Sequence, residues 1–369
     1  MTDVVVIGGG LAGLINAILL SRKGFSVVLF EKRNYPSHKV CGEYISNEVL
    51  PFLKRNELFP EELNVSRLNK FILSSTNGKF SAVDLDMGGF GISRYALDHF
   101  LYNKAFEAGV DCKTNTSVDS VEFFGDHFEI KSGKDLLKSK LAIGAFGKRA
   151  NLDKKLNRNF IKQRSPYLGV KYHIHTDFPN DTIALHNFKD GYCGISKIEN
   201  NTYNLCYLSH RDNLRQNEDI STMEENVLYK NPFLQSIFKN SDFIFEKPLV
   251  INEISFANKK PVENHILMSG DCAGMIAPLC GNGMAMAIHS ASILSSIIIS
   301  HWHDAQLDRE RIENEYSIIW NRQFSKRLWA GRKIQSLFGA ETATNFAVQL
   351  TKFKPIARSI MSLTHGKEF

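Results

Sequence analysis

The chain has 369 residues, 43% of them hydrophobic, and a formal net charge of +6 at pH 7, so it can bury the core of one large or two intertwined domains. The richest apolar run, AMAIHSASILSSIIIS, contains His289 and several serines, and it falls short of the about 18 uninterrupted apolar residues that a membrane span needs. Asp3 stands where a signal peptide has basic residues, and the six scattered cysteines predict reduced thiols, so we expect a cytoplasmic protein.

The first elements are predicted to be a strand, a glycine turn and a helix. The run DVVVIG is typical of a buried parallel strand, and apolar residues then recur at helical spacing until Gly24. Gly8 allows the tight turn, Gly10 lets a pyrophosphate approach the backbone, and Gly13 lets the helix pack on the strand. Because the helix N-terminus also offers free N–H groups, the turn predicts a diphosphate site.

A second strand, FSVVLFEK, ends in an acid. Glu31 lies eighteen residues after Gly13, where a carboxylate can accept hydrogen bonds from an adenosine ribose, and we count the adjacent Lys32 among the cofactor contacts. An acid here disfavours a 2′-phosphate, so the motif predicts FAD or NAD rather than NADP. A turn that binds no ligand is the alternative.

A second glycine-rich loop, far along the chain, shows which of these two cofactors the chain is expected to bind. The apolar run HILMSG leads into Asp271, a loop that Pro278 closes, and a long helix opened by Gly281 and Gly283. Asp271 is placed to hydrogen-bond a ribityl hydroxyl, and the helix N-terminus would face a flavin ring. NAD has no ribityl chain, so the two loops together predict FAD.

The motifs GxGxxG and GD followed by AGxxxPxxGxG resemble those of the FAD-dependent oxidoreductases that include geranylgeranyl reductases and aromatic-ring hydroxylases, the group A flavin monooxygenases. The resemblance implies an α/β fold: a Rossmann-like FAD-binding domain of the glutathione reductase type, an inserted antiparallel β-sheet substrate domain and a C-terminal helical segment. It also implies that Arg94, at the start of a predicted helix, contacts FAD near the diphosphate or ribityl chain; an ordinary surface charge is the alternative. We expect the FAD-binding domain at 1–70, 95–155 and 255–320, the substrate domain at 71–94 and 156–254, and a basic helical segment at 321–369.

The stretch HKVCGEYIS resembles the Cys-Gly-Glu or Cys-Gly-Gly element of the geranylgeranyl reductase-like branch, which is therefore the closest branch. In that branch the element lies beside the flavin ring, which implies that Cys41 and Gly42 contact the cofactor. Cys280, in PLCGNG, would approach the same ring from the other loop. Cys41 and Cys280 are the candidate catalytic residues, with a reversible disulfide as a hypothesis; small buried side chains are the alternative. No metal site is expected.

Two segments bear on the reaction. Hydroxylases of this superfamily have an Asp-Gly pair where LAIGAFGKRANL has Phe146, which weakens reduction by NAD(P)H in the hydroxylase manner and leaves NAD(P)H a candidate electron donor. Between the cofactor motifs, β-branched and aromatic runs with a turn at Asn200-Asn201 predict a sheet with an apolar wall for an apolar small-molecule substrate. The tryptophan-rich signature of the halogenase branch is missing from this region, so halogenation is not expected.

The last segment carries the net charge. Residues 321–369 hold nine Lys and Arg against two Asp and Glu, which gives +7, whereas the other 320 residues hold 36 against 37 and sum to −1. A basic helical segment suits peripheral contact with a membrane, and a solvated helix face is the alternative. Nucleic acid is not expected as a partner, because no recognition motif accompanies the charge.

These features leave three hypotheses. In the first, an FAD-dependent oxidoreductase passes hydride through flavin N5 to or from an apolar lipid-, isoprenoid- or polyketide-like substrate. In the second, an FAD-dependent monooxygenase hydroxylates an aromatic substrate through a flavin C4a-hydroperoxide. In the third, a non-catalytic flavin-binding protein docks on membranes. Complete cofactor loops favour the two enzymes.

Overall fold

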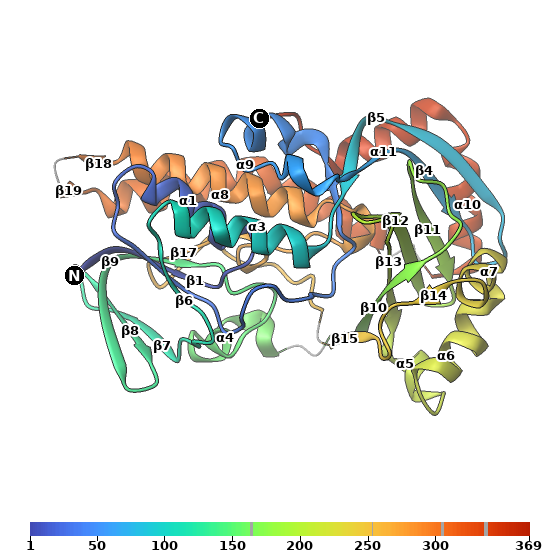
Figure 1. Cartoon of the computed structure of the whole chain (residues 1–369), viewed down its shortest axis with the longest axis horizontal. Helices are drawn as coiled ribbons and strands as arrows, with labels where there is room; N and C mark the ends of the chain where they lie inside the picture. Colours follow the sequence, from blue (N-terminus) through green and yellow to red (C-terminus); the bar gives the residue numbers. More distant parts are fainter. Residues whose placement is uncertain (163–164, 253, 304–305, 336–338) are drawn as a thin grey trace.

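The structure is a computed structural model, and it describes all residues except 163–164, 253, 304–305 and 336–338. Two large sheets lie side by side along the long axis of the molecule (Figure 1). The first contains the N-terminal glycine motif, and the second contains most of the aromatic strands between the two cofactor motifs. This arrangement confirms the predicted α/β fold.

The first sheet has the strand order β16-β17-β9-β1-β2-β6, and the hairpin β7-β8 continues from β9. Its central strand β1 runs parallel to both β2 and β9, and Val4, Val5 and Val6 are completely buried because strands flank them and helices cover them. The strands are β1 (Thr2–Ile7), β2 (Val27–Phe30), β6 (Asp111–Lys113), β7 (Ser120–Phe123), β8 (Phe128–Ser132), β9 (Asp135–Gly144), β16 (Val262–Glu263) and β17 (Ile266–Met268).

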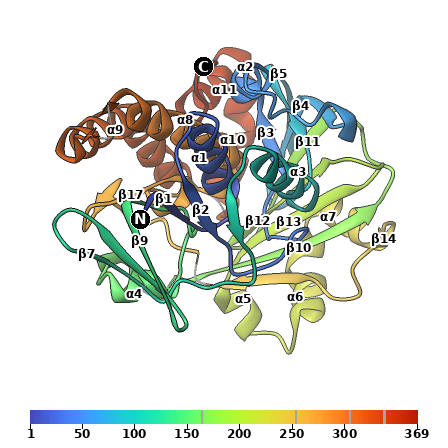
Figure 2. The same ribbon diagram turned by 60° about the vertical axis from the view of Figure 1, so that its left-hand side comes forward.

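Helices α1 (Leu11–Ser21), α3 (Arg94–Glu107) and α8 (Gly283–Ser300) cover one side of this sheet (Figure 2). By length and composition alone, α8 could cross a membrane, although 61% of its window is buried inside the protein. It packs between α1 and α9 (Arg309–Gln335), so it is a core helix. Short helices α2 (Leu50–Arg55) and α4 (Asn151–Lys155) and the strand pair β18 (Trp302–His303) and β19 (Gln306–Leu307) complete this half.

The second sheet has the order β14-β10-β13-β12-β11-β4-β5-β3, with β15 beside β10. All its pairs are antiparallel except β11 with β4. The predicted turn at Asn200 and Asn201 joins β12 to β13, and both residues have φ of +55°, which asparagine tolerates. The strands are β3 (Tyr44–Ser46), β4 (Ser66–Ser74), β5 (Phe80–Gly91), β10 (Tyr167–His175), β11 (Thr182–Phe188), β12 (Gly191–Lys197), β13 (Tyr203–His210), β14 (Asp242–Phe243) and β15 (Leu249–Asn252).

The chain enters the second sheet earlier than the sequence predicts. The expected domain boundary after residue 70 falls inside β4, and β3 lies before it. Strand β3 directly follows the Cys41-Gly42-Glu43 stretch and pairs with β5, so this stretch lies where the chain passes between the two sheets.

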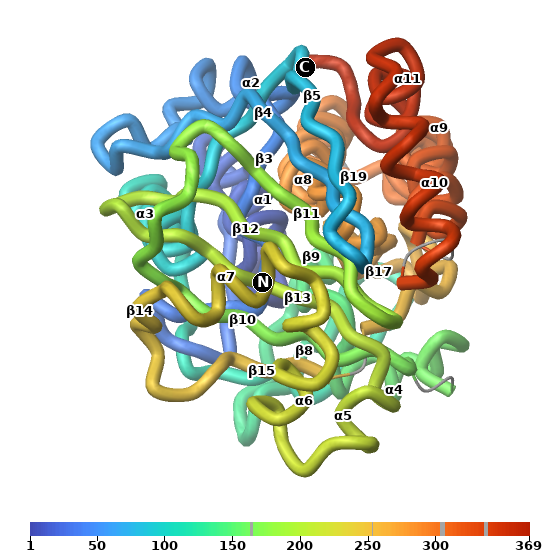
Figure 3. Tube along the Cα trace, turned by 90° about the vertical axis from the view of Figure 1, so that its right-hand side faces the viewer, coloured from blue at the N-terminus to red at the C-terminus, as the bar shows by residue number. Residues whose placement is uncertain are grey.

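The two faces of the second sheet bury different neighbours. One face packs on α6 (Ile220–Val227) and α7 (Pro232–Lys239), which follow α5 (Arg211–Arg215). The other face contributes to a buried cluster that we call the apolar wall: Leu73, Leu185, Tyr192, Leu208, Ile254 and Val348. Val348 belongs to α10 (Glu341–Thr351), which with α11 (Lys354–Thr364) and α9 runs along one side of the molecule (Figure 3).

Candidate functional site

The N-terminal glycine turn has the geometry of a nucleotide loop. Gly8 has φ of +107°, and its N–H donates to the carbonyl of Phe30 at 2.8 Å. A Cβ on Gly13 would lie 1.9 Å from the Gly8 oxygen, so only glycine lets α1 approach β1 this closely. A Cβ on Gly10 would have only the end of the Arg94 side chain nearby, at 3.6 Å, so the turn leaves space for a ligand there.

The acid after β2 fixes the same turn. Glu31 is 8% exposed, and its two carboxylate oxygens accept the N–H groups of Gly9 at 2.7 Å and of Arg33 at 3.0 Å. Each oxygen keeps a further lone pair for a ribose hydroxyl. Lys32 is exposed, and its role as a cofactor contact stays a prediction.

The second predicted loop folds as the sequence indicates. Asp271 is partly exposed, and among the described residues no group hydrogen-bonds to its carboxylate, which is therefore free to accept from a ligand hydroxyl. A short 3-10 helix begins at Pro278, Gly281 then has φ of +65°, and α8 begins at Gly283. The N-terminus of α8 lies at the end of this loop, where its N–H groups can meet a polar ligand edge.

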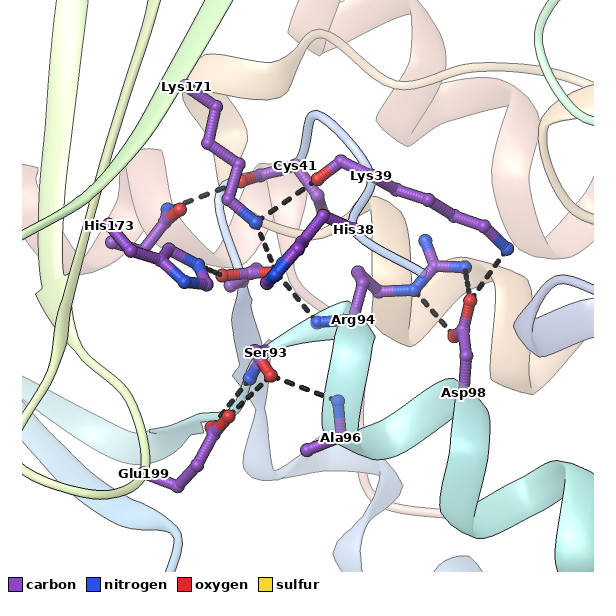
Figure 4. Close-up of polar contacts among 12 residues, drawn as sticks. His38, Lys39, Cys41, Ser93, Arg94, Ala96, Asp98, Lys171, His173 and Glu199 are labelled. Carbon is purple, nitrogen blue, oxygen red and sulfur yellow. Dashed lines mark hydrogen bonds and ion pairs between the residues drawn. The ribbon is translucent and has the colours of Figure 1, made fainter. Parts of the chain in front are cut away.

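Arg94 is held by a shared carboxylate near the glycine turn. Its guanidinium donates to both oxygens of Asp98 at 2.7 and 2.8 Å, and Lys39 donates to the same carboxylate at 2.7 Å (Figure 4). Burial alone would raise the pKa of Asp98, but the two cations outweigh burial and lower it. The arrangement holds the guanidinium of Arg94 near the glycine turn, and its contact with FAD stays a prediction.

The carboxylate of Glu43 accepts three hydrogen bonds, as does that of Asp98, and Figure 4 labels the three donor residues, Lys171, His173 and Arg94. The Glu43 carboxylate is fully buried and accepts from the Nζ of Lys171 at 2.5 Å, from the Nε2 of His173 at 2.8 Å and from the backbone N–H of Arg94 at 2.7 Å. Lys171 also donates to the carbonyl of Lys39 at 3.1 Å. Glu43 therefore ties the start of α3 to strand β10 of the second sheet.

The surroundings of Glu43 determine its charge. Burial would raise its pKa, but the cation of Lys171 and the hydrogen bond from His173 lower it below the ordinary value of 4.5. The backbone at Glu43 has φ of +53°, in the left-handed region that glutamate rarely adopts, so its contacts must hold it there. The carboxylate is thus a fixed anion where the two sheets meet.

Strands β10 and β13 present a row of side chains to the loop that carries Cys41. Lys171 pairs with Cys206 and His173 pairs with Asn204, whose side chain donates to the carbonyl of Cys41 at 3.2 Å. Cys206 and its cross-strand partner Gly194 are partly exposed, although their neighbours along both strands are buried. Solvent therefore reaches the middle of this sheet on the side of the Cys41 loop, and we call this place the junction.

The structure separates the two candidate catalytic cysteines by their surroundings. Cys41 is partly exposed, and its electrostatic neighbours include Arg94, Lys148 and Cys206. Cys280 is only 7% exposed, and burial raises its pKa to about 12. All six cysteines are free, so the hypothesised Cys41–Cys280 disulfide is not formed in this structure.

Sequence reasoning missed four members of the site: Glu43, which lies in the quoted stretch HKVCGEYIS but was not counted as a site residue, and Asp98, Lys171 and His173. A signal for two of them exists, because Lys171, His173 and His175 are polar residues at alternate positions of the strand YLGVKYHIH and so share one face. Asp98 lies four residues after Arg94 on α3, the spacing of a helical ion pair.

The residues present fit an FAD molecule. Open space lies at Gly10, no heavy atom lies within 4 Å of a Cβ built on Gly42, and the carboxylate of Asp271 has no protein donor among the described residues. Glu31, Arg94 and the N-termini of α1 and α8 would supply the polar groups for ribose, diphosphate and ring.

Relatives and solved structures of similar fold span most of the chain. Conditioned medium factor receptor 1 of Dictyostelium discoideum is 24% identical over 87% of this chain and 68% of its own length. A digeranylgeranylglycerophospholipid reductase of Methanosarcina acetivorans is 24% identical over 86% of this chain and 80% of its own.

Two solved structures share the fold. A geranylgeranyl bacteriochlorophyll reductase-like protein from Thermoplasma acidophilum has a TM-score of 0.78 at 15% identity, covering 98% of this chain and 96% of that one. A myxobacterial chondrochloren halogenase has a TM-score of 0.76 at 14% identity, covering 100% and 94%.

Replacing Gly10 and Gly13 by alanine separates ligand binding from folding. We expect Gly10→Ala to leave the melting temperature of the apoprotein nearly unchanged and to weaken FAD binding at least about tenfold, about 1.4 kcal/mol, because the new methyl takes ligand space. Gly13→Ala should destabilise the apoprotein itself, because its methyl meets the Gly8 carbonyl. Thermal unfolding and fluorescence titration with FAD measure both effects; wild-type FAD affinity in Gly10→Ala would contradict the assignment.

Removing the charge of Glu43 leaves Lys171 as a buried cation without its counter-ion. We expect Glu43→Gln to lower the free energy of unfolding by about 3 kcal/mol or more, and Glu43→Gln with Lys171→Met to recover part of the loss. Urea unfolding of the apoprotein at pH 7 measures this, and equal loss in both variants would argue against the ion pair.

The same pair predicts a pH dependence. Because the fold lowers the pKa of Glu43, its contribution to stability is fully present above its unfolded value of 4.5 and is lost as the pH falls through the folded value. The double variant should therefore lose less stability than the wild type between pH 6 and pH 3, as measured by urea unfolding at each pH.

A family model described as "FAD binding domain" matches residues 1–309, which include both cofactor loops, Arg94 and the Glu43 contacts. With this match, the predicted cofactor FAD and the predicted class of flavin-dependent oxidoreductase are confirmed. The chain belongs to the FAD-binding-domain family.

Proposed function

We propose that this flavin enzyme transfers a hydride to a carbon–carbon double bond of a long-chain apolar substrate of the isoprenoid-lipid class. The observation that carries the proposal is the apolar wall, which lies on the same side of the second sheet as the junction. Bound FAD, once an electron donor such as NAD(P)H has reduced it, would supply the hydride. The digeranylgeranylglycerophospholipid reductase among the relatives supports this substrate class.

The sheet register places the junction and the apolar wall in one row of neighbouring strands. Lys171, Cys206, Gly194 and Leu185 are cross-strand partners in one row of β10, β13, β12 and β11. The row therefore changes from a charged end, which holds the Cys41 loop, to an apolar end in the wall. Gly194 contributes no side chain in the middle, so a slender hydrocarbon chain could lie across the sheet there.

The buried ion pair supports a positioning role for Glu43, Lys171 and His173. These residues hold the Cys41 loop against β10 and leave Cys41 partly exposed. Reduction of a double bond adds a hydride to one carbon and a proton to the other. We assign the proton to the Cys41 thiol, which solvent then reprotonates.

A second candidate function is oxygen-dependent chemistry on an aromatic substrate. The apolar wall includes Tyr192, which would suit an aromatic ring equally well. The two candidates differ in whether oxygen is needed.

The test is an anaerobic turnover of the chemically reduced holoenzyme with a geranylgeranyl lipid, followed by mass spectrometry. We expect products that gain two hydrogen atoms per double bond without oxygen. A product that forms only in oxygen and gains an oxygen or halogen atom would replace the proposal by the second candidate. The Gly10→Ala variant controls for reduction by the chemical reductant alone.

Cys41→Ala should lower kcat at least about tenfold with little change in KM, because general acid catalysis contributes to the chemical step rather than to binding. Cys112→Ala is the matched control, since Cys112 is partly exposed on β6 at the far edge of the first sheet. Unchanged turnover in Cys41→Ala would remove the assigned proton donor and leave the hydride transfer standing.

A further inference from the structure

We propose that the outer face of α9, with the neighbouring helices α10 and α11, docks the protein on an anionic phospholipid bilayer. This surface is separate from the junction, and the proposal does not depend on which reaction the flavin performs. The argument uses the spacing of residues on α9, the exposure of large apolar side chains and the sign of the charge.

Helix α9 has two faces of opposite character. Its buried face contains Ile312, Tyr316, Trp320 and Phe324, which pack in the main core. Its outer face contains Ile318, Arg322, Lys326, Trp329 and Lys333, all exposed and spaced by four, four, three and four residues. This spacing puts the five side chains in one stripe along the helix.

The outer face of α9 interleaves cations with large apolar groups. Ile318 is 68% exposed and Trp329 is 59% exposed, while Arg322 and Lys326 form no ion pair within the described part of the chain. A face that only needs solvation gains nothing from an exposed tryptophan. Tryptophan among lysines and arginines is typical of helices that lie at the surface of anionic membranes.

The adjoining helices α10 and α11 also expose large apolar side chains. Phe346 of α10 is 65% exposed, Phe353 between α10 and α11 is 64% exposed, and Leu363 of α11 is 55% exposed. The helix α11 packs against both α9 and α10, so these side chains belong to one bundle (Figure 3). On the opposite side, α10 buries Val348 in the apolar wall. The bundle therefore lies between the apolar wall and the exterior.

The positive charge of residues 321–369 favours an anionic partner for this surface. Residues 321–369 carry nine Lys and Arg against two Asp and Glu, and three of these cations, Lys354, Arg358 and Arg327, form ion pairs with acids outside this segment, namely Asp84, Asp86 and Glu48. A second copy of the chain would bring like charges together, so self-association through this surface is disfavoured. An anionic lipid surface neutralises the cations and accepts the exposed aromatic groups.

The test is co-sedimentation of the FAD-loaded full chain with vesicles of phosphatidylcholine alone or mixed with phosphatidylglycerol. We expect binding to the mixed vesicles that falls as salt is raised, and little binding to phosphatidylcholine. Arg322→Gln with Lys326→Gln should weaken binding about tenfold or more, whereas Lys23→Gln with Lys134→Gln, two exposed lysines outside the C-terminal helices, should not.

Trp329→Ser with Phe353→Ser tests the apolar part of the surface. We expect about a tenfold loss of binding at fixed salt, while Phe106→Ser with Phe124→Ser, which removes two exposed aromatic groups elsewhere, leaves binding unchanged. The absorbance spectrum of bound FAD checks that every variant is folded. Absence of binding to anionic vesicles at low salt, or equal losses in test and control variants, would overturn the proposal and point to an acidic protein partner instead.

Discussion

The buried carboxylate of Glu43 is the constraint on which the rest of the site depends. A charged group can remain buried only if partners replace the water it loses, and here the partners come from different parts of the chain: the start of α3 and strand β10. Satisfying Glu43 therefore fixes the position of the FAD-binding half against the second sheet. The Cys41-Gly42 loop, which directly precedes Glu43, is positioned by the same bonds.

The junction and the apolar wall exist because the two faces of the second sheet pack against different parts of the chain. One face packs on its own helices, and the other is left for the FAD-binding half and for α10. Because Glu43 holds one end of this second face close to the glycine motif, solvent can reach Gly194 and Cys206 between the two halves. A site formed in this way has a charged end beside the cofactor loops and an apolar end beside the C-terminal helices.

The sequence was sufficient for the parts of the site that rest on local backbone geometry. The spacing of Gly8, Gly10 and Gly13 after an apolar strand dictates a turn that few ligands other than a diphosphate can use, and the structure has that turn. The partners of Glu43 could not be found in this way, because Lys171 is 128 residues away and meets it only through the pairing of two domains. Likewise, the grouping of Cys41 with Cys206 depends on the register between β10 and β13, which no local pattern encodes.

The sharing of Asp98 by two cations has a consequence for cofactor binding. Arg94 and Lys39 carry two positive charges and Asp98 one negative charge, and Glu31 brings a second negative charge to the same turn, so these four side chains carry no net charge. A diphosphate bound there would therefore rely on the free N–H groups at the start of α1 as well as on the guanidinium of Arg94.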